Sequence, residues 1–425
     1  MREDILSALS PETRAVHTPF PADDAYGSLN MPVYQTVAYE FQTAAQMERA
    51  FTGRSAEHVY SRISNPSVQY FENRVKVLTG GADVVAFASG MAAIVNTFMA
   101  IAYAGCNIVT SPHLFGNTYS LLATTLKDFG VEARFCDLTR PEEVNVQIDG
   151  KTCAVFLEVI TNPQMEVADL LALSALCREK GVPLIADTTI VPFTVFHAGE
   201  FGVDIEIVSS TKYISGGATS LGGLILDYHT FDWRHSPKLA PLVGEFKDAA
   251  FLTKMRREIH RNLGAYMSPQ AASFQTLGLE SLTVRYRQAA KTCQELAERL
   301  THVEGVVSVN YPGLASHPHH AVSQAQFGDC PGAMLTFDLV SREACFRFID
   351  CLQLIRRATN LFDNKTLAIH PASTIFGTFS EKVRQSMDIS QQTIRLSVGL
   401  EHADDLFEDL QQAVTQASNS VTVFS

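Results

Sequence analysis

The 425-residue chain lacks any run of about 20 apolar residues, so we expect no transmembrane helix. Its first residues, MREDILSALSPETRAVH, mix acidic and basic side chains without an apolar stretch, and we therefore expect no signal peptide. Basic residues are also in deficit, because 33 Lys and Arg stand against 45 Asp and Glu, for a formal net charge of −12. Nucleic acids and anionic membrane surfaces are not the expected partners, since they select clustered positive charge.

Cysteine pairs of the CxxC type are absent as well. The eight cysteines are scattered along the chain, at positions 106, 136, 153, 177, 293, 330, 345 and 351. In a long chain without a secretion signal, this distribution favours free, buried thiols over a disulfide framework. We therefore expect a cytoplasmic protein.

What the sequence does contain is an alternation of short apolar segments with helical segments. Strands are expected at 84–89, 107–111, 131–137, 153–160, 182–189, 204–211 and 221–227. Helices are expected at 69–78, after Gly90 through Tyr103, after 107–111 through Phe129, and at 168–180. This alternation predicts an α/β protein with an open, mostly parallel sheet flanked by helices. Ligands of such sheets bind beyond the carboxyl ends of the strands.

Three regions are expected along the chain. Residues 1–65 look like an irregular arm with turn-rich stretches such as 19–24, and residues 66–265 form the large domain. Residues 266–425 read as a smaller α+β domain with a long helix at 280–302. Strands are expected there in VVSVNYP, AMLTFDL and TLAIHP, and a helix at 342–353.

The sharpest chemical signal is Lys212, in SSTKYISGGATSLGG (209–223), just beyond an apolar strand. A desolvated lysine is nucleophilic and suited to imine formation with an aldehyde. The neighbouring hydroxyls of Ser209 and Thr211 can hold a phosphate on the same loop. A surface lysine in a Gly-rich turn is the ordinary alternative, and only further residues decide between the two.

Two charged residues interrupt otherwise apolar strands. Asp187 ends the strand in VPLIADTT, where an isolated buried carboxylate needs a partner. A protonated pyridine nitrogen is such a partner, and the pair would make pyridoxal phosphate (PLP) an electron sink; a helix N-cap or a metal ligand is the alternative. Arg395, in IRLSVGLE, suits the α-carboxylate of an amino acid, with an internal salt bridge as the alternative.

Two weaker motifs could bind phosphate. In AFASGMAA (86–93) a strand runs through Ser89, Gly90 and Met91 into a helix, and backbone N–H groups at a helix N-terminus bind phosphate. In YSRISNP (60–66), Tyr60 and Arg62 lie in the arm, where no core requires them, and together they suit a phosphate group. Many α/β proteins contain a turn like the first, and a solvent-facing turn would explain the second.

Together these motifs resemble the Cys/Met-metabolism PLP enzymes, the cystathionine γ-synthase-like branch of the fold-type I enzymes. The resemblance runs from TRAVH (13–17) to IRLSVGLE, with the motifs in the family's order. The stretch TKYISGGATSLGGLILDYHTFDW is most similar to the O-acetylhomoserine sulfhydrylases. Gly217 stands where cystathionine γ-synthases and γ-lyases usually have a histidine.

The resemblance implies a role for each motif. Lys212 would hold PLP as an imine and move protons, Asp187 would pair with the pyridine nitrogen, and Phe115 would stack on the ring. The remaining cofactor contacts would be Ser89, Gly90, Met91, Asn162 (with Glu158 behind it), Thr189, Ser209 and Thr211, with Tyr60 and Arg62 reaching the PLP of a partner subunit. Arg395, helped by Ser373, would take the substrate carboxylate. The family's usual assembly is a homotetramer.

Three departures from the family pattern concern the substrate. The family generally has Tyr-Gly-Gly-Thr where this chain has Phe115-Gly116-Asn117-Thr118, so a stacking ring remains without its hydroxyl. Asn117 is also not the cysteine that marks methionine γ-lyases. HPASTIFGTFS replaces the family's more usual sequence near the substrate, and Ile375 and Phe376 are expected to make that wall more apolar.

The expected reaction is γ-replacement on an O-activated homoserine, such as O-acetylhomoserine, with sulfide or a thiol giving homocysteine or a thioether amino acid. A γ-lyase that releases a 2-oxo acid and ammonia is the main alternative. An aminotransferase is a further alternative within PLP chemistry. A non-catalytic PLP-binding or scaffold protein is an alternative from another class. A metal enzyme built on HPHH (317–320) is disfavoured, because no carboxylate or cysteine stands at ligand spacing, and a solvated loop is expected there.

Overall fold

The computed structural model describes residues 9–20, 26–80 and 82–419. Residues 1–8, which open the stretch expected to lack a signal peptide, lie outside the described residues, as do 21–25 of the turn-rich stretch 19–24. The chain divides into two compact units, each built from two separate stretches. The first unit is Met1–Tyr103 with Asp204–Ser281, and the second is Ala104–Val203 with Leu282–Ser425.

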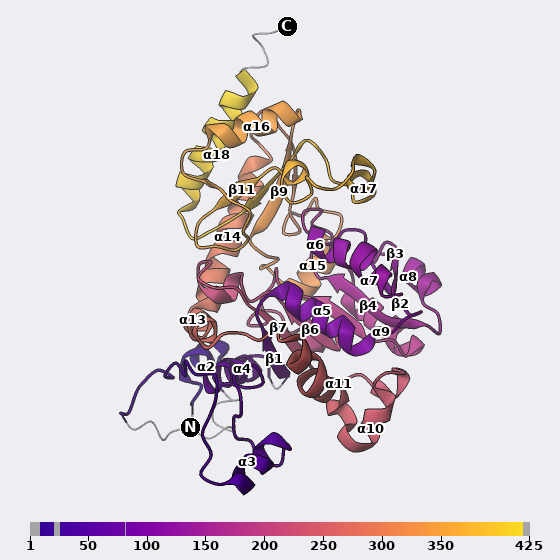
Figure 1. The fold of residues 1–425 in the computed structure, drawn as a ribbon. Helices are drawn as coiled ribbons and strands as arrows, with labels where there is room; N and C mark the ends of the chain where they lie inside the picture. The colour runs from indigo at the N-terminus through magenta and orange to yellow at the C-terminus, as the bar shows by residue number, and fades with distance from the viewer. Residues whose placement is uncertain (1–8, 21–25, 81, 420–425) are drawn as a thin grey trace. The chain divides into compact units, whose positions relative to one another are not determined.

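The first unit contains helices around three strands of the larger sheet (Figure 1). Its elements are α2 (Pro11–His17), α3 (Ala44–Phe51), α4 (Pro66–Leu78), β1 (Asp83–Phe87), α5 (Gly90–Ile101), β6 (Ile205–Val208), η3 (Tyr213–Ser215), β7 (Gly223–Asp227), η4 (Trp233–His235), α10 (Ala240–Phe246), η5 (Lys247–Ala249), α11 (Ala250–Lys254), η6 (Met255–His260), α12 (Arg261–Leu263) and α13 (Pro269–Glu280).

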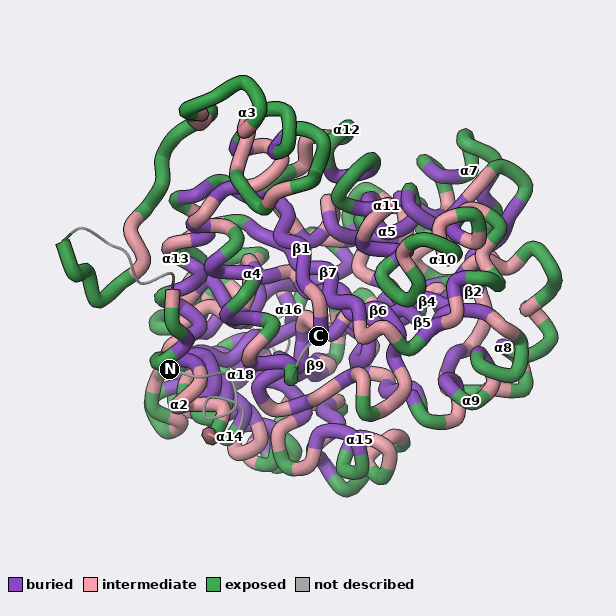
Figure 2. Tube along the Cα trace, turned by 90° about the horizontal axis from the view of Figure 1, so that it is seen from below, coloured by how far each residue is buried: buried purple, intermediate pink, exposed green. Residues whose placement is uncertain are grey.

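Strand β7 runs antiparallel to both β1 and β6. The connection from β6 to β7 carries only the short helix η3 among its described residues. All four residues of β6 and all five of β7 are buried, which matches their apolar sequences. Figure 2 shows β1 and β7 as buried segments inside this unit.

The second unit contains the other four strands of the larger sheet and a smaller sheet. Its elements are β2 (Asn107–Thr110), α6 (Gly116–Ser120), η1 (Leu121–Thr125), α7 (Leu126–Asp128), β3 (Glu132–Phe135), α8 (Pro141–Gln147), β4 (Thr152–Glu158), α9 (Leu170–Lys180), β5 (Leu184–Asp187), η2 (Ala198–Phe201), α14 (Leu282–Leu300), β8 (Val306–Asn310), α15 (His320–Phe327), β9 (Met334–Leu339), α16 (Arg342–Cys351), β10 (Arg356–Arg357), β11 (Leu367–Ile369), η7 (Pro371–Ser373), α17 (Glu381–Ser386), β12 (Thr393–Ser397) and α18 (Ala403–Asn419).

The four strands of the larger sheet in this unit are parallel. Strand β2 lies between β3 and β4, and β4 pairs with β5. The centre of β4, in TCAVFLE, is fully buried, as is typical of a parallel strand covered on both faces. Glu158 pairs in register with Asp187, so the carboxyl ends of β4 and β5 coincide. The predicted α/β class with a mostly parallel sheet is confirmed.

The smaller sheet has the strand order β10-β11-β12-β9-β8 and is antiparallel except at β10–β11. Helix α14 packs against β8 and β9, and α18 packs against α14 and α16 (Figure 1). The strands and helices predicted after residue 280 are present here, which confirms a separate, smaller α+β region.

The expectation of a wholly irregular arm is wrong at two places. Helix α2 begins at Pro11, a residue that favours the first helical turn, and Arg14 Nη1 donates to the carbonyl of Val77 at 3.0 Å. Helix α3 is capped by Thr43, whose side chain accepts the N–H of Gln46. Figure 2 shows α3 as largely exposed, so only part of the arm packs on the rest of its unit.

Two expectations about composition can be compared with the structure. The eight cysteines, all within the described ranges, are free, and Cys106 Sγ lies 3.5 Å from Cys153 Sγ. Across the part of the chain that the structure describes, every helix is too short or too polar to span a bilayer.

Candidate active site

Lys212 lies in a tight turn that follows β6 in the first unit. The N–H of Lys212 donates to the carbonyl of Ser209 at 3.1 Å, and its own carbonyl accepts the N–H of Ser215 at 3.2 Å. The Ser215 hydroxyl donates to the same carbonyl at 3.2 Å. These bonds fix the backbone of the lysine at the end of a fully buried strand, as the sequence predicts.

Glycines bring the loops around Lys212 close together. A Cβ on Gly90 would lie 2.7 Å from the Cβ of Ser209, and one on Gly223 would lie 2.1 Å from the carbonyl oxygen of Ser89. Both positions therefore require glycine, since real Cβ atoms do not approach so closely. The segments 89–91 and 209–212, both predicted to bind phosphate, meet within one unit.

The segments 89–91, 209–212 and 222–223 together form what we call the cradle, and hydrogen bonds hold its loops in place. The Thr211 hydroxyl donates to the carbonyl of Gly222 at 3.1 Å and accepts its N–H at 3.0 Å. Ser89 caps α5, with its hydroxyl accepting the N–H of Ala92 at 3.1 Å. The first turn of α5 contains no acidic residue, so the positive end of a 12-residue helix faces no competing charge in its own first turn. A phosphate group fits this arrangement.

Asp187 and Glu158 end neighbouring strands in the second unit. Asp187 Oδ1 accepts the N–H of Thr189 at 2.9 Å, which orients its carboxylate. Burial and then the charge of Asp187 raise the pKa of Glu158 well above its usual range, against the opposing effect of N–H donors from Phe115 and Asn162. Asp187 lies at the carboxyl end of an apolar strand, as predicted.

Phe115 is held through its backbone. Its N–H donates to Glu158 Oε1 at 2.6 Å, and Phe115 immediately precedes α6. The same Glu158 carboxyl also accepts the N–H of Asn162. One buried acid thus fixes the segment with the predicted stacking ring and the segment with the predicted cofactor amide.

Arg395 is buried in the middle of β12, with only 2% of its surface exposed. Its Nη1 donates to Asn162 Oδ1 at 3.3 Å, and its Nη2 donates to the carbonyls of Thr359 at 3.4 Å and Asn360 at 3.3 Å. Its Nε has no partner, and no acid within the described ranges forms an ion pair with it. Burial lowers the pKa of Arg395 to about 9. The internal salt bridge considered from sequence is therefore not found.

The segment predicted to face the substrate differs from the sequence prediction at one residue. Ser373 is exposed, in η7, and its hydroxyl lies 2.8 Å from His370 Nδ1. Phe376, predicted to line an apolar wall, is instead fully buried in a cluster with Ala372, Met387 and Ile389. Ile375 packs on this cluster from outside, so Phe376 supports the wall rather than forming its surface.

Tyr60 and Arg62 lie at the end of the arm and contact each other. The guanidinium of Arg62 lies 5.3 Å from the centre of the Tyr60 ring, and its Nη1 donates to the carbonyl of Arg261 at 2.6 Å. Tyr60 is 40% exposed. The pair is accessible within this chain, as a contact to a second subunit requires.

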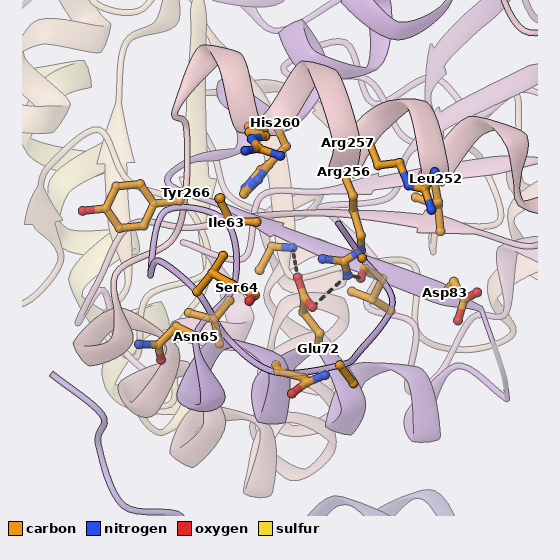
Figure 3. A pocket seen from close by; sticks show the side chains of 18 of the residues that line it. Ile63, Ser64, Asn65, Glu72, Asp83, Leu252, Arg256, Arg257, His260 and Tyr266 are labelled. Atoms are coloured by element: carbon orange, nitrogen blue, oxygen red, sulfur yellow. Dashed lines mark hydrogen bonds and ion pairs between the residues drawn. The ribbon is translucent and has the colours of Figure 1, made fainter. Parts of the chain in front are cut away.

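A cavity of about 750 Å³ lies within the first unit, between α4, β1 and the helix that includes η6 (Figure 3). Glu72 accepts the N–H of Ala86 at 2.8 Å and pairs with Arg256 Nη2 at 2.8 Å. His260 lines it, and Nε2 of His260 has no partner in the described structure. None of the predicted cofactor residues lines this cavity, so the site assignment rests on the loops and strand ends above.

Two features of the structure were not predicted from the sequence: a cluster around His113 and the burial of one histidine in the HPHH loop (317–320). His113 contacts both Glu166 and Asp388, and the only signal in the sequence is a histidine just after a strand end in NIVTSPHLF. In HPHH, His317 is 8% exposed rather than solvated, because the chain turns there into α15.

Comparison with known proteins extends these observations. Residues 12–415 match the family of Cys/Met metabolism PLP-dependent enzymes. O-acetyl-L-homoserine sulfhydrylase 1 of Thermus thermophilus is 36% identical over 420 residues, which cover 95% of this chain and 99% of the relative. Sulfhydrylase-like protein lolC1 of Epichloe uncinata is 38% identical, over 95% of this chain and 88% of that protein.

Solved structures agree. A putative O-acetylhomoserine (thiol)-lyase of Campylobacter jejuni, which contains a pyridoxyl-lysine phosphate, superposes with a TM-score of 0.87 at 33% identity, over 96% of this chain and all of that chain. The O-acetylhomoserine sulfhydrylase of Wolinella succinogenes is 44% identical, with a TM-score of 0.75, over 83% of this chain and 99% of that chain. The predicted enzyme class and cofactor are confirmed, and the chain belongs to the Cys/Met metabolism PLP-dependent enzymes.

Proposed function

We propose that this enzyme catalyses γ-replacement on O-acetylhomoserine, in which sulfide or a thiol displaces acetate to give homocysteine or a thioether amino acid. The names of the relatives from Thermus thermophilus, Campylobacter jejuni and Wolinella succinogenes support this substrate. Two residues of the chain support this substrate independently. Arg395 is a buried cation that suits a carboxylate, and Phe115 lacks the hydroxyl of the family's tyrosine.

The buried Arg395 is the observation that carries the proposal. A guanidinium with 2% exposure, a free Nε and no ion pair in the described structure is an uncompensated buried cation. Such a charge is costly unless an anion joins it, and a carboxylate can accept two parallel N–H bonds from it. We infer that the α-carboxylate of an amino-acid substrate is this anion, with Ser373 as a further contact.

The described residues fit PLP. The cradle built by Ser89, Gly90, Ser209 and Thr211 suits its phosphate, and Asp187 suits its pyridine nitrogen. When bound, PLP supplies an electron sink for negative charge at the substrate Cα. We propose that Lys212 would hold the cofactor. Its amine, once released by the substrate, would take the proton from Cα, deliver it to C4′ of the cofactor, and only then take a second proton from Cβ.

The Phe115 ring bears on the leaving group. A phenylalanine cannot donate a proton, so a group that leaves without protonation is favoured at this position. Acetate is the anion of an acid of pKa near ~4–5, whereas a thiolate leaving group belongs to a thiol of pKa near ~8.5. An O-acyl substrate therefore suits this chain better than a methionine-like thioether.

The assembly and location belong to the same proposal. We propose a homotetramer in which Tyr60 and Arg62 reach the phosphate in a partner subunit, which their contact and the exposure of Tyr60 support. A cytoplasmic location is supported by the eight free cysteines, all among the described residues. An arm (1–65), a PLP-binding domain (66–265) and a C-terminal domain (266–425) remain the proposed division.

The test is product analysis of the PLP-loaded protein with O-acetylhomoserine, with and without sulfide. Homocysteine that forms only with sulfide is the expected result. Abundant 2-oxobutyrate in both conditions would instead establish a γ-lyase, and pyridoxamine phosphate would indicate an aminotransferase. A cofactor spectrum that responds to no amino acid would point to a non-catalytic PLP-binding protein.

A further inference from the structure

His113 bridges two acids that come from distant segments of the second unit. Its Nδ1 lies 2.6 Å from Glu166 Oε2, and its Nε2 lies 3.0 Å from Asp388 Oδ2. Glu166 follows the Asn162–Pro163 turn, and Asp388 follows α17, 275 residues away from His113. The His113 side chain is 12% exposed and that of Asp388 is 76% exposed.

Both contacts together require a charged imidazole. Ionised carboxylates only accept hydrogen bonds, and a neutral imidazole has one N–H, so two acids can be held only by the doubly protonated ring. Burial lowers the pKa of His113, but the hydrogen bonds and charges of Glu166 and Asp388 outweigh burial and raise it overall. His113, Glu166 and Asp388 line one cavity of about 300 Å³. Within the described residues, the other titratable group that lines this cavity is Asp338 of β9, which is also an acid.

The contact to Asp388 holds one end of the segment 371–389. The backbone of Asp388 is left-handed, with φ +52°, a conformation that persists only where surrounding contacts hold it. Gln164 Nε2 donates to the carbonyl of Met387 at 2.5 Å. The end of the segment is therefore attached to the turn that carries Gln164 and Glu166.

The other end of the segment packs on helix α6, which begins just after Phe115. The Tyr119 ring lies edge-on to Phe379, with the ring centres 5.8 Å apart, and it stacks on Phe135 at 5.0 Å. A Cβ on Gly116 would lie 3.1 Å from the carbonyl oxygen of Ile375. The segment thus lies between an apolar contact at one end and the His113 ion pairs at the other.

We propose that His113 is a positioning residue, which through Asp388 holds the segment carrying Ser373 and Ile375 in place for the amino-acid substrate. The inference rests on the proposed function only in naming that substrate. His113 itself touches neither the proposed cofactor residues Asp187 and Asn162 nor Arg395 in any contact that the structure describes. Its loss should therefore change the fit of the substrate more than the rate of the chemical steps.

Three variants of the PLP-loaded enzyme test this. His113→Gln removes the charge, Asp388→Gly removes the acceptor while suiting a left-handed backbone, and Asp388→Asn retains an acceptor oxygen. We expect faster amide hydrogen exchange in residues 380–389 for the first two, with Asp388→Asn closer to the parent. Asp405→Asn, an exposed acid on α18, is the matched control.

The kinetic result expected is a KM for O-acetylhomoserine raised about tenfold in His113→Gln, with kcat and the KM for sulfide little changed. The parent should show the same rise in KM at alkaline pH, and His113→Gln should not. Unchanged exchange in 380–389, or faster exchange with an unchanged KM, would overturn the inference. If the parent does not turn over O-acetylhomoserine, the proposed function fails, while the exchange comparison still decides the role of His113.

Discussion

The two units arrange their predicted functional residues by different means. In the first unit, backbone groups and glycines form a cradle from the segments 89–91, 209–212 and 222–223. In the second unit, buried polar and charged side chains are held by partners far away in sequence, such as Asn162 and Arg395, which are 233 residues apart. The first arrangement tolerates little change at glycines, and the second tolerates little change of charge.

The largest effect is expected from the lysine of the cradle. Lys212→Ala should reduce turnover of O-acetylhomoserine to background, because no other amine is proposed to hold the cofactor or to move the Cα proton. The loss should be visible both in product assays and as the disappearance of the imine absorption. Lys127→Ala, at an exposed lysine of the second unit, is the control and should behave like the parent. Normal turnover in Lys212→Ala would contradict the proposed site.

The charged half of the site is tested next, at Arg395. Arg395→Lys keeps a positive charge but loses the two-pronged geometry, so the KM for O-acetylhomoserine should rise by about 10- to 100-fold. Steady-state kinetics should show a smaller change in kcat. A KM equal to that of the parent would mean that another group binds the substrate carboxylate.

The glycines of the cradle offer a matched pair. Gly223→Ala places a Cβ 2.1 Å from the carbonyl oxygen of Ser89, so PLP binding should weaken and the free energy of unfolding should fall by about 1–3 kcal/mol. In Gly244→Ala the new Cβ would meet no atom within 4 Å, and its helix should gain about 0.5–1 kcal/mol. PLP titration and urea unfolding measure both. Equal behaviour of the two variants would show that the close approach does not matter.

The smallest effect is expected on the pH dependence of the free energy of unfolding, to which one buried histidine in each unit should contribute in the same direction. Burial, and then nearby positive charges, lower the pKa of His260 in the first unit and of His317 in the second to about 4. The unfolded chain binds more protons than the folded one between pH 4 and the usual histidine value near ~6.5, so stability should rise with pH in that window.

Glutamine at either position should remove about 1–2 kcal/mol of this pH dependence, as measured by urea unfolding at pH 4.5 and 7.5. His402→Gln, at a histidine whose side chain is 73% exposed, should leave the dependence unchanged. A pH profile identical in all three variants would place the acid sensitivity elsewhere.

Most of the strands, and the residues at their ends, could be predicted from the sequence. The run TCAVFLE is apolar enough to be buried on both faces, and the positions of Asp187 and Lys212 beyond such runs were predicted correctly. The turns around Ser89 and Thr211 could also be predicted, because a glycine-rich turn next to a strand is a local pattern in the sequence. The two helices of the arm were missed, because short helices stabilised by a cap or one long contact leave little periodicity.

Local chemistry in the sequence therefore determined the α/β class, the order of the strands and helices, and the lysine, acid and arginine around which PLP chemistry is expected. Only the tertiary structure decided that Phe376 is buried, that Arg395 forms no salt bridge in the described part of the chain, and that His113 joins Glu166 to Asp388. Strands and turns depend mainly on residues that are neighbours in the sequence, so their patterns can be recognised there. The partner of a buried charge can come from any distance along the chain, so only the folded structure shows whether the charge has a partner.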